Sequence, residues 1–438
     1  MSATPLGLIF LALTAVVLFR RAWIPWLLAA TMPFVQTSGL IFGGNDVSPF
    51  FIAAVPALIW CIGDALSGKR LRYAGFSLFV TAVFVLSAVT LPVIFEGTPV
   101  LVPRGGIDDQ VMAPGALEFS ISNLAQAGYF VLSVAVILYI ANNPPKRPHF
   151  LALGFGIGTV LSVWALAATY LGVFFPQAFF RPTTAETFDS YYGGAQRLRG
   201  IFAEPSYLAT FSVAALAFFV FLFLRVKKRR LLVGAAIVAN AAAAYFSFSG
   251  TAIAGLVALG IVVALVYGAR FLVMGGKVPP LAAVAGCLAA VPLILISPRI
   301  IAYVSDFVAG KLGSSSGSNR DASNVFSLDI LGDTYFLGVG LGSSRPSSFL
   351  FMMLSTVGVI GLALYVIWIV RLLRPAARNP EYHPELWATI AVIICKVIAE
   401  PNPSNPVMIL CLAAAAAAPA IVGGDAKRQS PSRVTTAA

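Results

Sequence analysis

Residues 205–230 have the sequence PSYLATFSVAALAFFVFLFLRVKKRR, in which a long uncharged run is followed at once by a cluster of basic residues. Because an α-helix rises about 1.5 Å per residue, a run of roughly 20 residues crosses the ~30 Å hydrocarbon core of a bilayer. Lys and Arg gather at the cytoplasmic ends of such helices. The stretch therefore predicts a membrane-spanning helix whose carboxyl end faces the cytoplasm.

The same pattern recurs along the chain of 438 residues, of which 59% are hydrophobic and 11% charged, with a mean hydropathy of +0.90. This composition excludes soluble multidomain proteins, collagens, coiled coils and disulfide-rich secreted scaffolds. We predict an all-α polytopic membrane protein with about 13 transmembrane helices. The apolar runs fall near residues 5–19, 22–42, 48–66, 74–95, 119–140, 150–175, 205–224, 231–248, 250–273, 280–297, 347–370, 386–400 and 404–423.

The charges between these runs predict the orientation. Most of the 29 Lys and Arg residues fall in alternate, short connections, and most of the 17 acids fall in the others. Since only Lys and Arg set orientation, we predict a bacterial inner (plasma) membrane protein with a periplasmic N-terminus and a cytoplasmic C-terminus. The first basic residues, Arg20 and Arg21, follow the first apolar run, so this run is predicted to be retained as a span.

The domain organisation follows from this topology. An integral membrane helical domain is predicted over residues 1–424 and a disordered cytoplasmic tail over 425–438. Long connections on a protein that is nearly all membrane are where function is expected. In the loop predicted at 298–346, apolar residues at helical spacing from Val325 to Leu331 predict a short helix that begins near Arg320. The long periplasmic loops are predicted at 96–118, 176–204 and 298–346.

The residues available for chemistry are few. The chain has two histidines, both in predicted cytoplasmic loops, and its four cysteines lack metal-type spacing, so no metal site and no cofactor are expected. The glycine run Gly338–Gly342 follows no convincing strand and is interpreted as a flexible turn rather than a nucleotide site. Arginines do stand out in the predicted periplasmic loops, against the orientation bias. They are Arg197, Arg199, Arg320 and Arg345.

Guanidinium groups bind phosphate oxygens in a bidentate manner and stay charged at any relevant pH. Two or three of them meeting at the membrane surface would make a diphosphate site. The alternative is structural, because acids on the same side, such as Glu204, Asp321 or Asp333, can pair with these arginines. Both interpretations stay open for any single arginine.

Ordered motifs lead to a family resemblance. Arg199-Gly200-Ile201-Phe202-Ala203-Glu204-Pro205-Ser206 introduces one span, and Ser318-Asn319-Arg320 precedes Leu337–Gly342 and Leu354–Gly361. Over residues 195–370 the chain resembles the O-antigen ligase and polymerase superfamily of bacterial envelope glycosyltransferases. The resemblance implies an all-helical, metal-independent enzyme that uses an undecaprenyl-diphosphate-linked glycan. By matching motif, Arg199 and Arg320 would hold the diphosphate.

The resemblance also separates two activities. Arg345 falls where ligases of the family carry a histidine, which favours the polymerase branch: repeat units would be joined into O-antigen or exopolysaccharide at the periplasmic face. The alternatives are an O-antigen ligase that transfers glycan to lipid A core, a lipid-linked oligosaccharide flippase or transporter, and a structural protein. Expected partners are the lipid-linked glycan and membrane lipids, with a chain-length regulator and a flippase as further candidates, and no nucleic acid.

Several other residues near the predicted site have both a functional and a structural interpretation. Glu204 is the candidate base for the acceptor hydroxyl or the ion-pair partner of Arg199. Arg197 is a candidate substrate-binding residue. Lys396 and Glu400, one turn apart, are expected to form an intrahelical pair, although ionisable groups at membrane depth are also functional candidates. Three tyrosines can stack on sugar rings or anchor the protein at the interface: Tyr191, Tyr192 and Tyr207.

Overall fold

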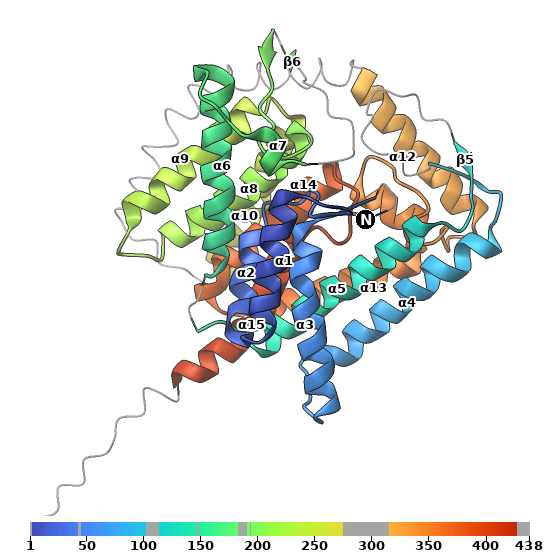
Figure 1. Ribbon diagram of the computed structural model, residues 1–438, viewed down its shortest axis with the longest axis horizontal. Coiled ribbons are helices and arrows are strands. Elements are labelled where there is room, and N and C mark those ends of the chain that lie inside the picture. Colours follow the sequence, from blue (N-terminus) through green and yellow to red (C-terminus); the bar gives the residue numbers. More distant parts are fainter. Residues whose placement is uncertain are drawn as a thin grey trace, which may run out of the picture.

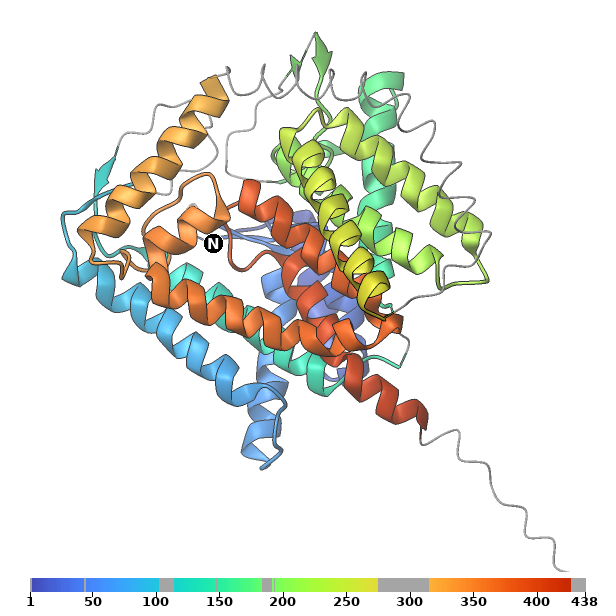
Figure 2. The same ribbon diagram turned by 180° about the vertical axis from the view of Figure 1, so that it is seen from behind.

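A computed structural model describes residues 2–42, 45–101, 114–146, 149–182, 191–192, 194–274 and 315–426. The described chain is a bundle of helices with a few very short strands (Figures 1 and 2). The helices of the first half are α1 (Pro5–Leu18), η1 (Arg21–Trp23), α2 (Ile24–Thr31), α3 (Pro49–Leu66), α4 (Ala74–Ile94), α5 (Ile121–Asn142), α6 (Leu151–Leu171) and α7 (Gln177–Phe180).

The second half continues the helical bundle. Its helices are α8 (Pro205–Phe223), α9 (Arg230–Phe246), α10 (Gly250–Met274), α12 (Ser315–Asp333), α13 (Phe349–Arg378), η2 (Pro380–Tyr382), α14 (His383–Ile398) and α15 (Pro406–Ala426). The strands form one three-stranded antiparallel sheet and two hairpins. They are β1 (Ser2–Ala3), β2 (Leu40–Phe42) and β3 (Asn45–Val47), then β4 (Pro99–Val100) with β5 (Gly115–Ala116), and β6 (Tyr191–Tyr192) with β7 (Ala195–Gln196).

Seven of the described helices are long and apolar enough to cross a membrane: α3, α4, α5, α6, α8, α10 and α13. Shorter apolar helices are α1, α9 and the first part of α15. The all-α class is therefore confirmed, and the chain is compatible with a multi-pass membrane protein. The count of about 13 spans is not confirmed, and the predicted run 280–297 lies outside the described residues.

One predicted span is not a single helix. The run from 22 to 42 forms α2, which ends at Thr31, and its last residues form β2. Pro33 explains the early end, because proline has no amide to donate and its ring clashes with the carbonyl one turn earlier in a continuing helix. At the other end of the chain α15 continues to Ala426, slightly beyond the predicted boundary at 424, and the rest of the predicted tail lies outside the described residues.

The core of the bundle lies around α8, α14 and α15. Every residue of α15 from Val407 to Ala418 is buried, and its alanines allow α5 and α13 to pack closely against it. Helix α8 packs against both α9 and α14 and is the most buried of the seven candidate spans, whereas α10 is the least. The stretch that predicts a membrane span most clearly is thus an interior helix.

Helix α13 is broken at Gly358, which has φ 67° and ψ −172°. Residues 336–342 pack into this break: the Val339 amide donates to the Ser355 carbonyl over 2.8 Å and the Gly340 amide donates to the Thr356 carbonyl over 2.8 Å. A Cβ on Gly340 would lie 2.7 Å from the ring of Pro92. The glycine run is therefore a buried segment whose amides donate to carbonyl groups at the break in α13. The interpretation as a flexible turn is wrong.

Candidate functional site

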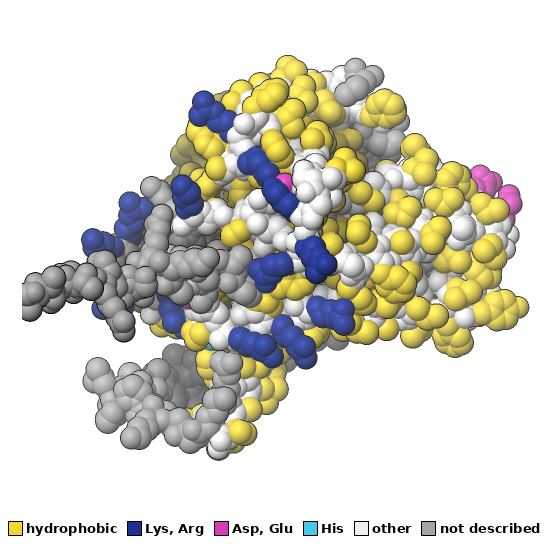
Figure 3. Space-filling view, turned by 90° about the horizontal axis from the view of Figure 1, so that it is seen from below, with side chains coloured by type: hydrophobic (Ala, Val, Ile, Leu, Met, Phe, Trp, Pro, Cys, Tyr) yellow, Lys and Arg dark blue, Asp and Glu magenta, His cyan; other side chains and the backbone are white. Residues whose placement is uncertain are grey.

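Two ends of the bundle differ in charge. One face, which we call the basic face, gathers exposed Lys and Arg side chains and few acids (Figure 3). The opposite end of the bundle, which we call the far end, is where α8 begins at Pro205 and α14 ends at Ile398. Most of the candidate residues lie around the far end. We assign to the basic face the described cations at the carboxyl ends of α1, α3, α5, α8 and α13 and in the connections that follow them: Arg20, Arg21, Lys69, Arg70, Arg72, Lys146, Arg225, Lys227, Lys228, Arg229, Arg230, Arg371, Arg374 and Arg378.

The start of α8 organises the far end. Glu204 is the N-cap residue in extended conformation and Pro205 occupies the first turn, where its missing amide costs nothing. The Ser206 hydroxyl donates to the Glu204 carboxylate over 2.9 Å. This geometry keeps Glu204 half-buried at the mouth of the helix and turns Tyr207 into the bundle, where its ring is buried.

Tyr207 is the meeting point of several charges. The exposed Arg345 guanidinium donates from Nη2 to the Tyr207 hydroxyl across 3.5 Å, the long limit for such a bond. Glu204, Arg345 and Glu400 all act electrostatically on this hydroxyl. We call Glu204, Tyr207, Arg345, Lys396 and Glu400 the Tyr207 cluster. Because Tyr207 is buried among charged groups, its environment differs from that of a tyrosine anchored at a membrane interface.

The interior part of the Tyr207 cluster is a buried ion pair. Lys396 Nζ lies 3.6 Å from Glu400 Oε1 and donates to the Glu400 carbonyl over 3.1 Å. Asn405 Nδ2 also donates to Oε1 of Glu400. The predicted pair is confirmed, but it is not intrahelical: α14 ends at Ile398, and Glu400 has left-handed backbone with φ 67°.

A second group at the far end joins two arginines. With the Gln177 amide oriented so that its oxygen accepts, Arg199 Nη2 lies 3.2 Å away and Arg181 Nη2 shares the same oxygen. Arg181 is buried, and its Nη1 donates to the Phe202 carbonyl over 3.1 Å. We call Gln177, Arg181 and Arg199 the Gln177 group. Arg181 was missed from the sequence, although its position in the predicted loop 176–204 fitted the criterion used for the other arginines.

The remaining predicted arginines, Arg197 and Arg320, lie on different elements of the structure. Arg197 donates from Nε to the Ser247 carbonyl over 3.2 Å, at the end of α9. Arg320 lies on α12, which contains the predicted helix but begins earlier, at Ser315. One turn beyond Arg320, the Ser323 hydroxyl lies 3.0 Å from the Ser347 hydroxyl. This contact docks α12 on the loop that carries Arg345.

The two tyrosines of the β6–β7 hairpin lie apart from Tyr207. Tyr191 is exposed, and the backbone of Tyr192 pairs with Ala195. The hairpin projects at the top of Figure 1. It therefore presents Tyr191 to the surroundings of the bundle, whereas Tyr207 lies inside it. Residues 183–190 and 298–314 of the predicted loops lie outside the described residues.

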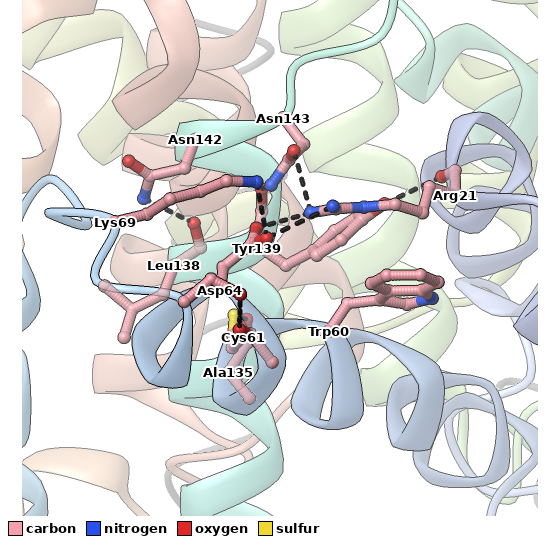
Figure 4. Close-up of polar contacts among 12 residues, drawn as sticks. Arg21, Trp60, Cys61, Asp64, Lys69, Ala135, Leu138, Tyr139, Asn142 and Asn143 are labelled. Carbon is pink, nitrogen blue, oxygen red and sulfur yellow. Dashed lines mark hydrogen bonds and ion pairs between the residues drawn. The ribbon is translucent and has the colours of Figure 1, made fainter.

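A polar cluster at the basic face was not anticipated (Figure 4). Both amino groups of the Arg21 guanidinium donate to the Asp64 carboxylate, Nη1 over 3.1 Å. Lys69 Nζ binds the same carboxylate at 2.8 Å, and the Arg21 guanidinium stacks 4.4 Å from the Trp60 ring centre. The hydrogen bond to Asp64 raises the pKa of Arg21 above its ordinary value. We call Arg21, Asp64 and Lys69 the Asp64 cluster; it ties η1 to α3.

The histidines also pair at this side of the bundle. His149 Nδ1 lies 2.7 Å from Glu385 Oε1, and His383 Nδ1 lies 3.1 Å from the Tyr267 hydroxyl. Burial is the largest influence on the pKa of His149 and lowers it. The hydrogen bond and the charge of Glu385 outweigh that influence, so the net pKa is raised. Because His149 and His383 lie at the start of α6 and α14, they are remote from the Tyr207 cluster.

Neither a family model nor a curated protein matches the chain. In the described part of the chain, no three His, Cys, Asp or Glu side chains lie close enough to hold a metal ion. The groups that the structure brings together at the far end are arginines, carboxylates and a tyrosine hydroxyl.

Proposed function

We propose that the chain is a membrane glycosyltransferase of the polysaccharide-polymerase type, which joins undecaprenyl-diphosphate-linked repeat units at the far end of the bundle. The observation that carries the proposal is the Tyr207 cluster: the exposed Arg345 guanidinium contacts the Tyr207 hydroxyl, and the half-buried Glu204 carboxylate acts on the same hydroxyl at the mouth of a core helix. The proposed topology has about thirteen spans, a periplasmic far end and a cytoplasmic basic face.

The proposed reaction needs a cation and a base. The acceptor hydroxyl attacks the anomeric carbon of the donor, the bond from that carbon to the diphosphate oxygen breaks, and the lipid diphosphate leaves with the electron pair. Arg345 stabilises the charge that develops on the phosphates, which is worth more near a low-dielectric boundary than in water. The hydroxyl proton goes to Glu204, which fits this role better than Glu400, since Glu204 is half-buried at the mouth of α8 and Glu400 is buried.

The other arginines extend the proposed site. The Gln177 group lies next to the start of α8 through the contact of Arg181 with Phe202, and it supplies two further guanidinium groups. Arg320 approaches from α12 through the Ser323 contact. In this proposal Arg345, Arg199 and Arg320 bind the diphosphate, and Arg197 and the exposed Tyr191 contact the glycan.

A lipid-linked oligosaccharide transporter is the second candidate function. It is favoured by two observations: α13 is interrupted at Gly358, and the Lys396–Glu400 pair is fully buried. Broken helices and ionisable groups at membrane depth are typical of transporters. A transporter would move the intact lipid-linked unit without joining units together, so the products distinguish the two functions.

The test is glycan analysis of a deletion strain complemented with variants. For a polymerase, Glu204→Gln and Arg345→Ala leave single repeat units on the lipid carrier and on the cell surface, while the protein stays in the membrane at normal abundance. Arg230→Ala, an exposed arginine of the basic face, is the matched control and should give normal chains. Long chains of normal length in both far-end variants would overturn the proposal, and loss of all surface glycan would favour the transporter.

A further inference from the structure

A groove opens on the basic face between the start of α4 and the end of α13. Its volume is about 790 Å³, and its lining includes Tyr73, Arg371, Arg374, Arg378 and Glu381. A smaller hollow of about 240 Å³ shares Tyr73 and Arg371 with it. The proposed glycosyl transfer uses neither space, because it is placed at the far end of the bundle.

The groove carries an excess of positive charge. The three arginines are spaced three and four residues apart, which puts them on one side of the last turns of α13. All three are exposed, and within the described chain none of them forms an ion pair, while Glu381 is the one acid of the lining. Arg72 adds a further cation at the rim, since its Nη2 donates to the Tyr73 hydroxyl over 3.0 Å. This arrangement complements an anion with several oxygens.

The lining of the smaller hollow is mostly apolar. The Arg371 guanidinium lies 4.3 Å from the ring centre of Phe76, and Leu71 and Trp368 line the wall. Phe79, three residues after Phe76 on α4, and Val370, next to Arg371 on α13, are exposed on candidate membrane spans. Exposed apolar side chains of two packed helices thus accompany the arginines, as an acyl chain would require and a free phosphate would not.

We propose that this groove binds an anionic phospholipid. Its phosphate is bound by Arg371, Arg374 and Arg378, and its acyl chain lies along the exposed faces of α4 and α13. Basic pockets between membrane helices bind acidic head groups in this way, and each Lys or Arg near the surface contributes about 1 kcal/mol. The proposal is independent of the reaction at the far end.

The experiment uses the purified full-length protein in detergent with phosphatidylglycerol or phosphatidylcholine, and native mass spectrometry counts the bound lipid. The triple variant Arg371→Gln/Arg374→Gln/Arg378→Gln should bind phosphatidylglycerol roughly 100-fold more weakly than the wild type. The matched control is Lys227→Gln/Lys228→Gln/Arg230→Gln, which removes three exposed cations from the same face and should keep wild-type binding.

Each outcome decides the proposal. Equal loss of phosphatidylglycerol in both triple variants would show general attraction to the basic face and overturn it. Equal binding of phosphatidylcholine by the wild type would also overturn it. Inorganic phosphate that displaces the lipid at millimolar concentration would point to a free-phosphate site instead. The single variant Arg374→Glu, with unchanged elution on size exclusion, repeats the test in case the triple variant folds poorly.

Discussion

The Asp64 cluster and the Tyr207 cluster both place a buried carboxylate beside a lysine, but their surroundings differ. At the basic face the side chains of Arg21 and Lys69 are 29% and 58% exposed, so water solvates the cations that neutralise Asp64. At the far end the side chains of Lys396 and Glu400 are 0% and 2% exposed.

This difference decides what each ion pair can contribute. Taking two charges out of water costs several kcal/mol per ion, and their attraction repays this only when hydrogen bonds complete the site. Asp64 avoids most of that cost because its partners reach water, so its cluster is explained as a link between η1 and α3. The Lys396–Glu400 pair is a poor source of stability, although removing one partner alone leaves a buried charge uncompensated.

Removal of one partner should distinguish the two clusters most strongly. Lys396→Met leaves the Glu400 carboxylate buried without its cation and should lower the free energy of unfolding by about 3–5 kcal/mol. Lys69→Met, the control at the basic face, should cost about 1 kcal/mol or less. Thermal unfolding in detergent measures both. The double variant Lys396→Met/Glu400→Gln should recover much of the loss, and equal losses for Lys396 and Lys69 would refute the comparison.

Arginines at the two ends should affect different quantities. Arg345→Ala should reduce the rate of glycan extension roughly 100-fold and hardly change stability, because its side chain is exposed and acts on developing charge. Arg345→Lys should recover only a small part of the rate, since a lysine lacks the planar bidentate group. The rate is measured with lipid-linked units extracted from the deletion strain. A normal rate with Arg345→Ala would contradict its proposed role.

Substitution in the Asp64 cluster should change stability and leave the rate of glycan extension unchanged. Arg21→Ala removes the bidentate contact with Asp64 and the hydrogen bond to Asn143, so it should lower the free energy of unfolding by about 1–3 kcal/mol. The rate per folded molecule should stay at the wild-type value. Arg20→Ala is the matched control, because Arg20 is adjacent in the sequence and its own side chain makes no ion pair within the described chain. A specific loss of rate with Arg21→Ala would mean that the clusters are coupled.

The smallest expected effect is a pH dependence at the basic face. The pKa of His149 is raised in the folded protein by Glu385, so the protonated pair stabilises the fold fully below the ordinary histidine pKa of about 6.5. That contribution, about 1 kcal/mol or less, is lost as the pH rises through the folded pKa. Thermal unfolding between pH 5.5 and about pH 8.5 should show the decline in wild type and not in His149→Gln. The same decline in both would rule out His149 as its source.

Local sequence patterns predicted helices well where the residues of the helix itself determine its position. The uncharged run before Arg225 is helix α8, and the apolar spacing of Val325 to Leu331 lies in α12. The prediction failed where a local breaker competes with hydropathy, as at Pro33, or where another segment completes the structure, as at Gly358. Hydropathy records transfer to lipid, and it does not record which backbone groups a distant loop will satisfy.

The sequence by itself determined the helical class, the position of α8 and the asymmetric distribution of charge, because hydropathy and helix geometry act within one turn or one span. Only the tertiary structure decided which charges meet: Arg21 reaches Asp64, His149 reaches Glu385, and Arg345 reaches Tyr207. These partners are far apart in the chain, so their contact depends on how α3, α8 and α14 pack. The physical reason is that a charge is stabilised by whatever folds against it, and composition does not specify that neighbour.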